Sequence, residues 1–211
     1  MKRRRLLARI LVVFVLLDLI AFYAYFKVER RHSHANPAAE SALIATGIDP
    51  NRIGQTVSLA RTSYSGGTHL ASYEEDGEVY GDAIDISPAE SRAACIAEVH
   101  RLRLAGFAAW WRGPDSPGGH APEGQGPHYH IVWAGHLTRN VEQREQIISF
   151  IHHFRGLARL WGSEAWATDG RHVDPTITPE EVHAVQRAYR AVYPHDELSL
   201  KECYEARHVA G

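Results

Sequence analysis

The 211-residue sequence has few cysteines, no marked excess of either charge and no internal repeats. Cys95 and Cys203 are the only cysteines, so at most one internal disulfide can form. Cys95 lies in an apolar helical pattern, so a buried free thiol is as plausible for it as a disulfide. The net charge of −2 gives no electrostatic case for binding nucleic acid. Without repeats or low-complexity tracts, one globular domain is expected.

The one long apolar run lies at the N-terminus, after a basic end at residues 1–5. Residues 6–26 are about long enough to cross ~30 Å of hydrocarbon as a helix, although Arg9 and Asp18 interrupt the run. The positive-inside rule places the basic end in the cytoplasm. A cleaved signal peptide is the alternative, but KVERRHSH, which follows, is a poor cleavage context. We therefore expect a single-pass anchor in the cytoplasmic (inner) membrane, with the rest of the chain outside.

After the anchor, a polar spacer at residues 27–40 leads to one domain at residues 41–211. Apolar patterns predict strands at 56–60, 83–87, 107–111 and 128–134. Capping signals predict helices that begin after Ser87 and after Thr178, and a third helix is expected at 140–157. This order of elements predicts an α+β fold in which helices cover one side of a small antiparallel sheet.

Two long polar loops, at residues 61–82 and 112–127, each lead into a predicted strand. Loops of this length in a compact domain are usually functional or disordered. The second loop ends at GPHYHIVW, where His128 and His130 stand two apart. Side chains alternate between the faces of a strand, so these two histidines should point the same way. A shared ligand would explain why two imidazoles are directed at one place.

The first loop carries His69 and leads to Asp85, which stands between two isoleucines. An ionised carboxylate in apolar surroundings needs a cation or several hydrogen-bond donors. Two histidines and one aspartate form a known ligand set for catalytic Zn²⁺, which keeps a further position for water. His69, Asp85 and a histidine of the HYH segment are therefore candidate metal ligands.

These residues carry a resemblance to the LAS metallopeptidases, which include D-Ala-D-Ala peptidases, lysostaphin-type endopeptidases and hedgehog-like domains. GDAIDI (81–86) resembles the G-x-A-x-D segment of that family, and HYHI (128–131) is similar to its H-x-H strand. The resemblance covers roughly residues 55–160. It implies a hedgehog/D,D-peptidase-like fold in which His69, Asp85 and His130 bind Zn²⁺. It also implies that His128 acts in catalysis.

The first motif departs from the family pattern. The family's first histidine stands at the position that Glu78 occupies here, whereas His69 lies sixteen residues before Asp85. Either the loop is expanded and His69 folds back to Asp85, or the site has lost this ligand. Glu78 is the substitute in the second case, because carboxylates also bind zinc.

The resemblance implies a zinc-dependent hydrolase that cleaves amide bonds in peptidoglycan stem peptides or cross-links. Arg61 and Ser65 are candidate substrate-binding residues, and Glu123 is a second candidate for the base. The alternative is a non-catalytic zinc-containing module that binds cell-wall peptides or a partner protein. A third possibility is a structural anchor protein without metal, which predicts that His69 lies far from Asp85.

Overall fold

The computed structural model describes residues 15–18, 33–57, 69–113, 126–154 and 173–196. The chain divides into two compact units, residues 1–33 and 34–211. Residues 15–18 of the first unit are helical, and the rest of the predicted anchor lies outside the described residues. Among the described residues, no helix is both long enough and apolar enough to cross a membrane.

The second unit is built on a four-stranded antiparallel sheet with the strand order β2-β5-β7-β6. The strands of this main sheet are β2 (Ile53–Gln55), β5 (Ala83–Ile86), β6 (Phe107–Arg112) and β7 (His128–Trp133). In the register of the sheet, Asp85 on β5 lies opposite His130 on β7, and His130 lies opposite Trp110 on β6. Of the predicted strand at 56–60, residues 56 and 57 are not in a strand, since β2 ends at Gln55, and residues 58–60 lie outside the described residues.

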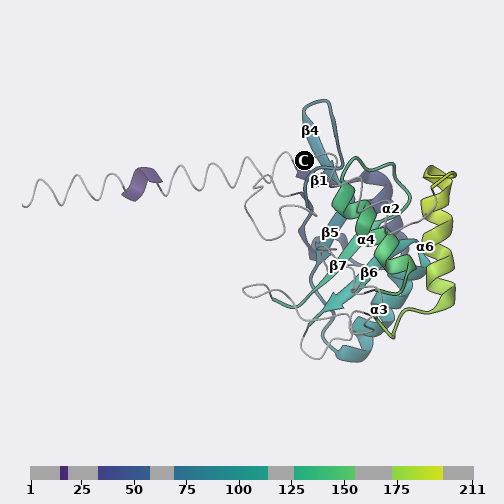
Figure 1. The fold of residues 1–211 in the computed structure, drawn as a ribbon. Helices are drawn as coiled ribbons and strands as arrows, with labels where there is room; N and C mark the ends of the chain where they lie inside the picture. Colours follow the sequence, from purple (N-terminus) through teal and green to yellow (C-terminus); the bar gives the residue numbers. More distant parts are fainter. Residues whose placement is uncertain (1–14, 19–32, 58–68, 114–125, 155–172, 197–211) are drawn as a thin grey trace, which may run out of the picture. The chain divides into compact units, whose positions relative to one another are not determined.

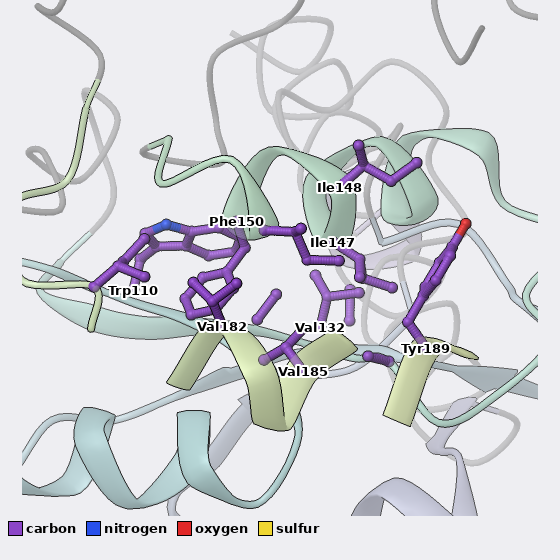
Figure 2. Packing of buried hydrophobic residues seen from close by; sticks show 13 residues of the cluster. Trp110, Val132, Ile147, Ile148, Phe150, Val182, Val185 and Tyr189 are labelled. Carbon is purple, nitrogen blue, oxygen red and sulfur yellow. The ribbon is translucent and has the colours of Figure 1, made fainter. Parts of the chain in front are cut away.

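Helices cover both faces of the main sheet. Apolar side chains on one face, such as Trp110 and Val132, pack against α4 (Val141–Ile151) and α6 (Pro179–Val192), as Figure 2 shows. On the other face the buried core is shared with α2 (Pro37–Ala45) and α3 (Arg92–Leu104), and its sheet residues are Ile84, Ile86, Phe107, Ala109, Tyr129 and Ile131. The α+β class is confirmed, but the expectation that helices cover only one side is wrong. Strands with apolar residues on both faces need cover on both.

A second, smaller sheet has the strand order β1-β4-β3. Its strands are β1 (Ser33–Ala35), β3 (Tyr73–Glu75) and β4 (Glu78–Gly81). Strands β3 and β4 lie in the segment predicted as a loop, and β1 lies in the predicted spacer, where α2 also begins. Asp76 and Gly77 join β3 to β4 with φ values of 53° and 78°. Such positive φ values at both central residues match the tight turn that Asp-Gly favours in hairpins. The sequence prediction missed this hairpin.

The helix starts agree with the capping signals at one place and differ at another. Thr178 and Glu181 form the predicted capping box at the start of α6. The helix predicted after Ser87 begins later, at Arg92, with Ser91 as its N-cap. The backbone of Ser87 is instead held against Arg52, through the bonds from Ser87 N to Arg52 O and from the Arg52 guanidinium to Ser87 O. Cys95 in α3 is a buried free thiol, and Cys203 lies outside the described residues.

Candidate metal centre

Three polar side chains meet on the face of the main sheet that α4 covers. His69, Asp85 and His130 each offer one ligand atom, and these atoms lie within 4.8 Å of one another. His130 Nδ1 is 2.8 Å from Asp85 Oδ1, and His69 Nε2 is 3.3 Å from the same oxygen. The sheet register brings Asp85 and His130 together, because they are direct partners on neighbouring strands. This group of side chains can hold a metal ion.

His69 reaches the site from the turn that precedes the small sheet. Its Nδ1 lies 2.8 Å from the carbonyl oxygen of Thr56, and its side chain is almost fully buried. The fifteen residues between His69 and Asp85 accommodate the β3–β4 hairpin, so the loop is expanded and the histidine folds back. The metal-free anchor hypothesis predicted that His69 lies far from Asp85, and the distance of 3.3 Å contradicts that prediction.

Glu78 does not take the place of His69. It lies at the start of β4, where its carboxylate is 3.1 Å from His34 Nε2. Both side chains of this pair are substantially exposed, at 47% for His34 and 34% for Glu78. Among the described residues, the ligand group contains His69 and not Glu78.

His128 stands beside this group on the same face of β7, as the spacing predicted. Its Nε2 is 4.0 Å from Asp85 Oδ1, and its Nδ1 is 2.8 Å from the carbonyl oxygen of Gly126. The side chains of His128 and Asp85 are each 13% exposed, whereas those of His69 and His130 are almost fully buried. The two partly exposed side chains thus form the accessible side of the group.

The three buried groups shift one another's ionisation. Burial alone would raise the pKa of Asp85, but the charge of His69 and hydrogen bonds from both histidines hold that pKa well below its usual range. Burial opposes the charged form of His69, yet Asp85 and the carbonyls of Thr56 and Ala83 outweigh burial and raise its pKa. Burial lowers the pKa of His130. The two histidines thus favour the charged form of the Asp85 carboxylate.

The outward nitrogens of the three imidazoles all meet oxygen acceptors. These acceptors are Thr56 O for His69, Gly126 O for His128 and Gln146 Oε1, at 2.9 Å, for His130. A carbonyl oxygen can only accept, so an imidazole that binds a metal through its inward nitrogen can donate its proton from the outward nitrogen to this oxygen. Metal-binding histidines are typically fixed in this way. One carboxylate faced by several such nitrogens is a fitting set for a cation such as Zn²⁺.

Three residues singled out in the sequence cannot be placed in this site. Arg61, Ser65 and Glu123 all lie outside the described residues. In the other direction, the structure adds two residues that the sequence prediction missed, Thr56 and Gln146. Each contacts a histidine that is more than ten residues away in the sequence, and neither belongs to a sequence motif that would have identified it as part of the site.

Comparisons with known proteins add no assignment. No family model, curated protein or solved structure matches this chain.

Proposed function

We propose that the chain is a zinc-dependent peptidase that hydrolyses amide bonds in peptidoglycan stem peptides or cross-links, in the manner of D,D-peptidases. The observation that carries the proposal is the convergence of His69, Asp85 and His130, with His128 beside them at 4.0 Å from Asp85. The motif resemblance supplies the substrate class. An N-terminal anchor at residues 6–26 would hold the domain on the outer side of the cytoplasmic membrane, where peptidoglycan lies.

Each residue of the group has a role that suits it chemically. His69 through Nε2, Asp85 through Oδ1 and His130 through Nδ1 would hold the metal. A bound Zn²⁺ lowers the pKa of a bound water and polarises the scissile carbonyl. His128 keeps the proton on Nδ1 through its bond to Gly126, so its Nε2 is available on the accessible side of the group. It is therefore suited to take a proton from water and return it to the leaving amine.

The test is zinc content and peptidoglycan digestion with the full-length chain in detergent. We expect about one bound zinc after dialysis and release of soluble peptides from isolated sacculi, measured by mass spectrometry. The variant His128→Ala should keep its zinc, but its rate should fall by about 100- to 10,000-fold, as is typical when a general base is removed.

The other outcomes separate the alternatives. Zinc without release of peptides, in a folded protein, would reject the peptidase and favour the non-catalytic module that binds cell-wall peptides or a partner protein. A folded chain that takes up no zinc would reject both zinc-dependent functions.

A further inference from the structure

The face of α4 that meets the site is polar, although it is buried. Gln143 is fully buried, and Gln146, one helical turn further on, is 6% exposed. Burying a side-chain amide costs free energy unless its polar atoms find hydrogen-bond partners. The partners of these two amides include the segments that carry the histidine ligands.

Gln146 contacts one ligand directly. Its Oε1 lies 2.9 Å from His130 Nε2, on the side of the imidazole that faces away from Asp85. Trp110 stacks over the same imidazole, with ring centroids 6.1 Å apart. The ring is thus held between Asp85 at one nitrogen and Gln146 at the other, and stacking limits its rotation.

The start of α4 contacts the turn that carries the other histidine ligand. Asn140 Nδ2 and Gln143 Nε2 both donate to the carbonyl oxygen of Leu70, at 3.1 and 3.2 Å. Gln143 Oε1 accepts from Ser72 Oγ at 2.7 Å. These bonds hold the start of α4 against the turn that carries His69. Because Gln146 lies on the same helix, they also help to position Gln146 beside His130.

We propose that Gln146 is a positioning residue that keeps the proton of His130 on Nε2 and presents Nδ1 to the metal. This inference rests on the metal binding in the proposed function. It extends the proposed function by assigning Gln146 as the hydrogen-bond acceptor that determines which nitrogen of His130 binds the metal. Outer partners of this kind typically account for about 10- to 100-fold in metal affinity.

The experiment compares Gln146→Leu, which removes the acceptor at similar volume, with Gln146→Glu, which keeps an acceptor. Zinc affinity is measured on the full-length chain by competition with a chromophoric chelator. We expect Gln146→Leu to bind zinc about 10- to 100-fold more weakly and Gln146→Glu to restore wild-type affinity. Ser149→Ala, a buried position three residues further along α4, is the matched control and should leave the affinity unchanged.

A spectroscopic readout separates positioning from general loosening of the fold. In ¹⁵N-histidine spectra of the zinc-loaded chain, we expect His130 to be coordinated through Nδ1 in the wild type and in Gln146→Glu. In Gln146→Leu, coordination should be divided between the two nitrogens. Wild-type affinity and unchanged coordination in Gln146→Leu would overturn this inference alone. A folded wild-type chain that binds no zinc would overturn the proposed function together with it.

Discussion

Arg103 and Asp85 are both charged side chains in largely buried surroundings, and the two surroundings differ in kind. Arg103 on α3 is 3% exposed and lies between two buried carboxylates, 3.1 Å from Asp174 and 3.4 Å from Glu181. Its remaining donors reach the carbonyl oxygens of Ala109 and Thr176. We call this group, with His100 at its rim, the arginine cluster.

The arginine cluster is complete without any added ion. A guanidinium presents five donors and no acceptor, and carboxylates and carbonyls meet these donors. The metal centre has the opposite composition. There one carboxylate faces several imidazole nitrogens, and oxygen acceptors of Thr56, Gly126 and Gln146 lie at the outward nitrogens of the same rings. The comparison teaches that a buried polar cluster whose donors and acceptors match each other indicates a structural role, whereas a carboxylate and imidazole nitrogens that converge on one place can hold a cation.

The largest effect is expected from breaking the complete cluster. Replacing Arg103 by Met leaves Asp174 and Glu181 buried without their counter-charge. Removing one partner of a buried ion pair costs about 3–5 kcal/mol, so the free energy of unfolding should fall by that amount in a denaturant titration. Arg101→Met is the control: Arg101 is 47% exposed and 3.9 Å from Glu98. Equal losses in both variants would show that the arginine cluster has no special role.

The second effect is specific to the metal centre. His69→Ala should abolish zinc binding, measured by elemental analysis after dialysis, because it removes one of the three ligands. It should also abolish stabilisation by zinc, which for one site amounts to about 2.7 kcal/mol at a free concentration one hundred times the Kd. The control variant His100→Ala, in the arginine cluster, should keep both zinc binding and stabilisation by zinc. Zinc retained by His69→Ala would place a ligand elsewhere.

The third effect is the pH dependence of the metal-free chain. The raised pKa of His69 gives stability that is fully present below the ordinary histidine pKa of about 6.5 and is lost as pH rises through the folded value. The lowered pKa of His130 acts in reverse, because below about 6.5 the unfolded chain binds a proton that the folded chain does not. Together these two groups predict a stability maximum near pH 6.5.

The lowered pKa of Asp85 adds a further loss at low pH. Its contribution is present above about 3.9, the ordinary value, and disappears as pH falls through the folded value. Thermal unfolding of the chelator-treated chain across this range is the measurement. His69→Gln should lose the decline above about pH 6.5 that the raised pKa produces. An unchanged decline in that variant would assign it to other groups.

The parts of the site that follow from strand geometry were predictable from sequence. The two-residue spacing of His128 and His130 fixes a shared face once the segment is a strand, and the register then places His130 opposite Asp85. The helix cover was misjudged, although the apolar Tyr129 and Ile131 between and beside the histidines indicate that the second face is buried as well. The Asp76-Gly77 hairpin signal was also present and was missed.

The remaining parts depend on contacts between distant segments. Gln146 and Thr56 are ordinary residues of a helix and a loop until the fold brings them to His130 and His69. The same holds for Arg103, whose partners Asp174 and Glu181 lie 71 and 78 residues further along the chain. The sequence likewise left His69 and Glu78 open as the third ligand, because the path of an expanded loop is set by the small sheet that it forms.

The smallest effect is expected at Glu78, the alternative ligand of the sequence prediction, which is not in the ligand group of the structure. Glu78→Gln breaks an exposed pair with His34, and exposed pairs contribute about 0–1 kcal/mol. Zinc stoichiometry and affinity should stay at wild-type values, since Glu78 is not in the ligand group. The matched variant Asp85→Asn should lose zinc, because it replaces the carboxylate on which both histidines converge. Chelator competition on the two variants decides the matter: weaker zinc binding in Glu78→Gln would mean that the hairpin carboxylate, and not His69, completes the site.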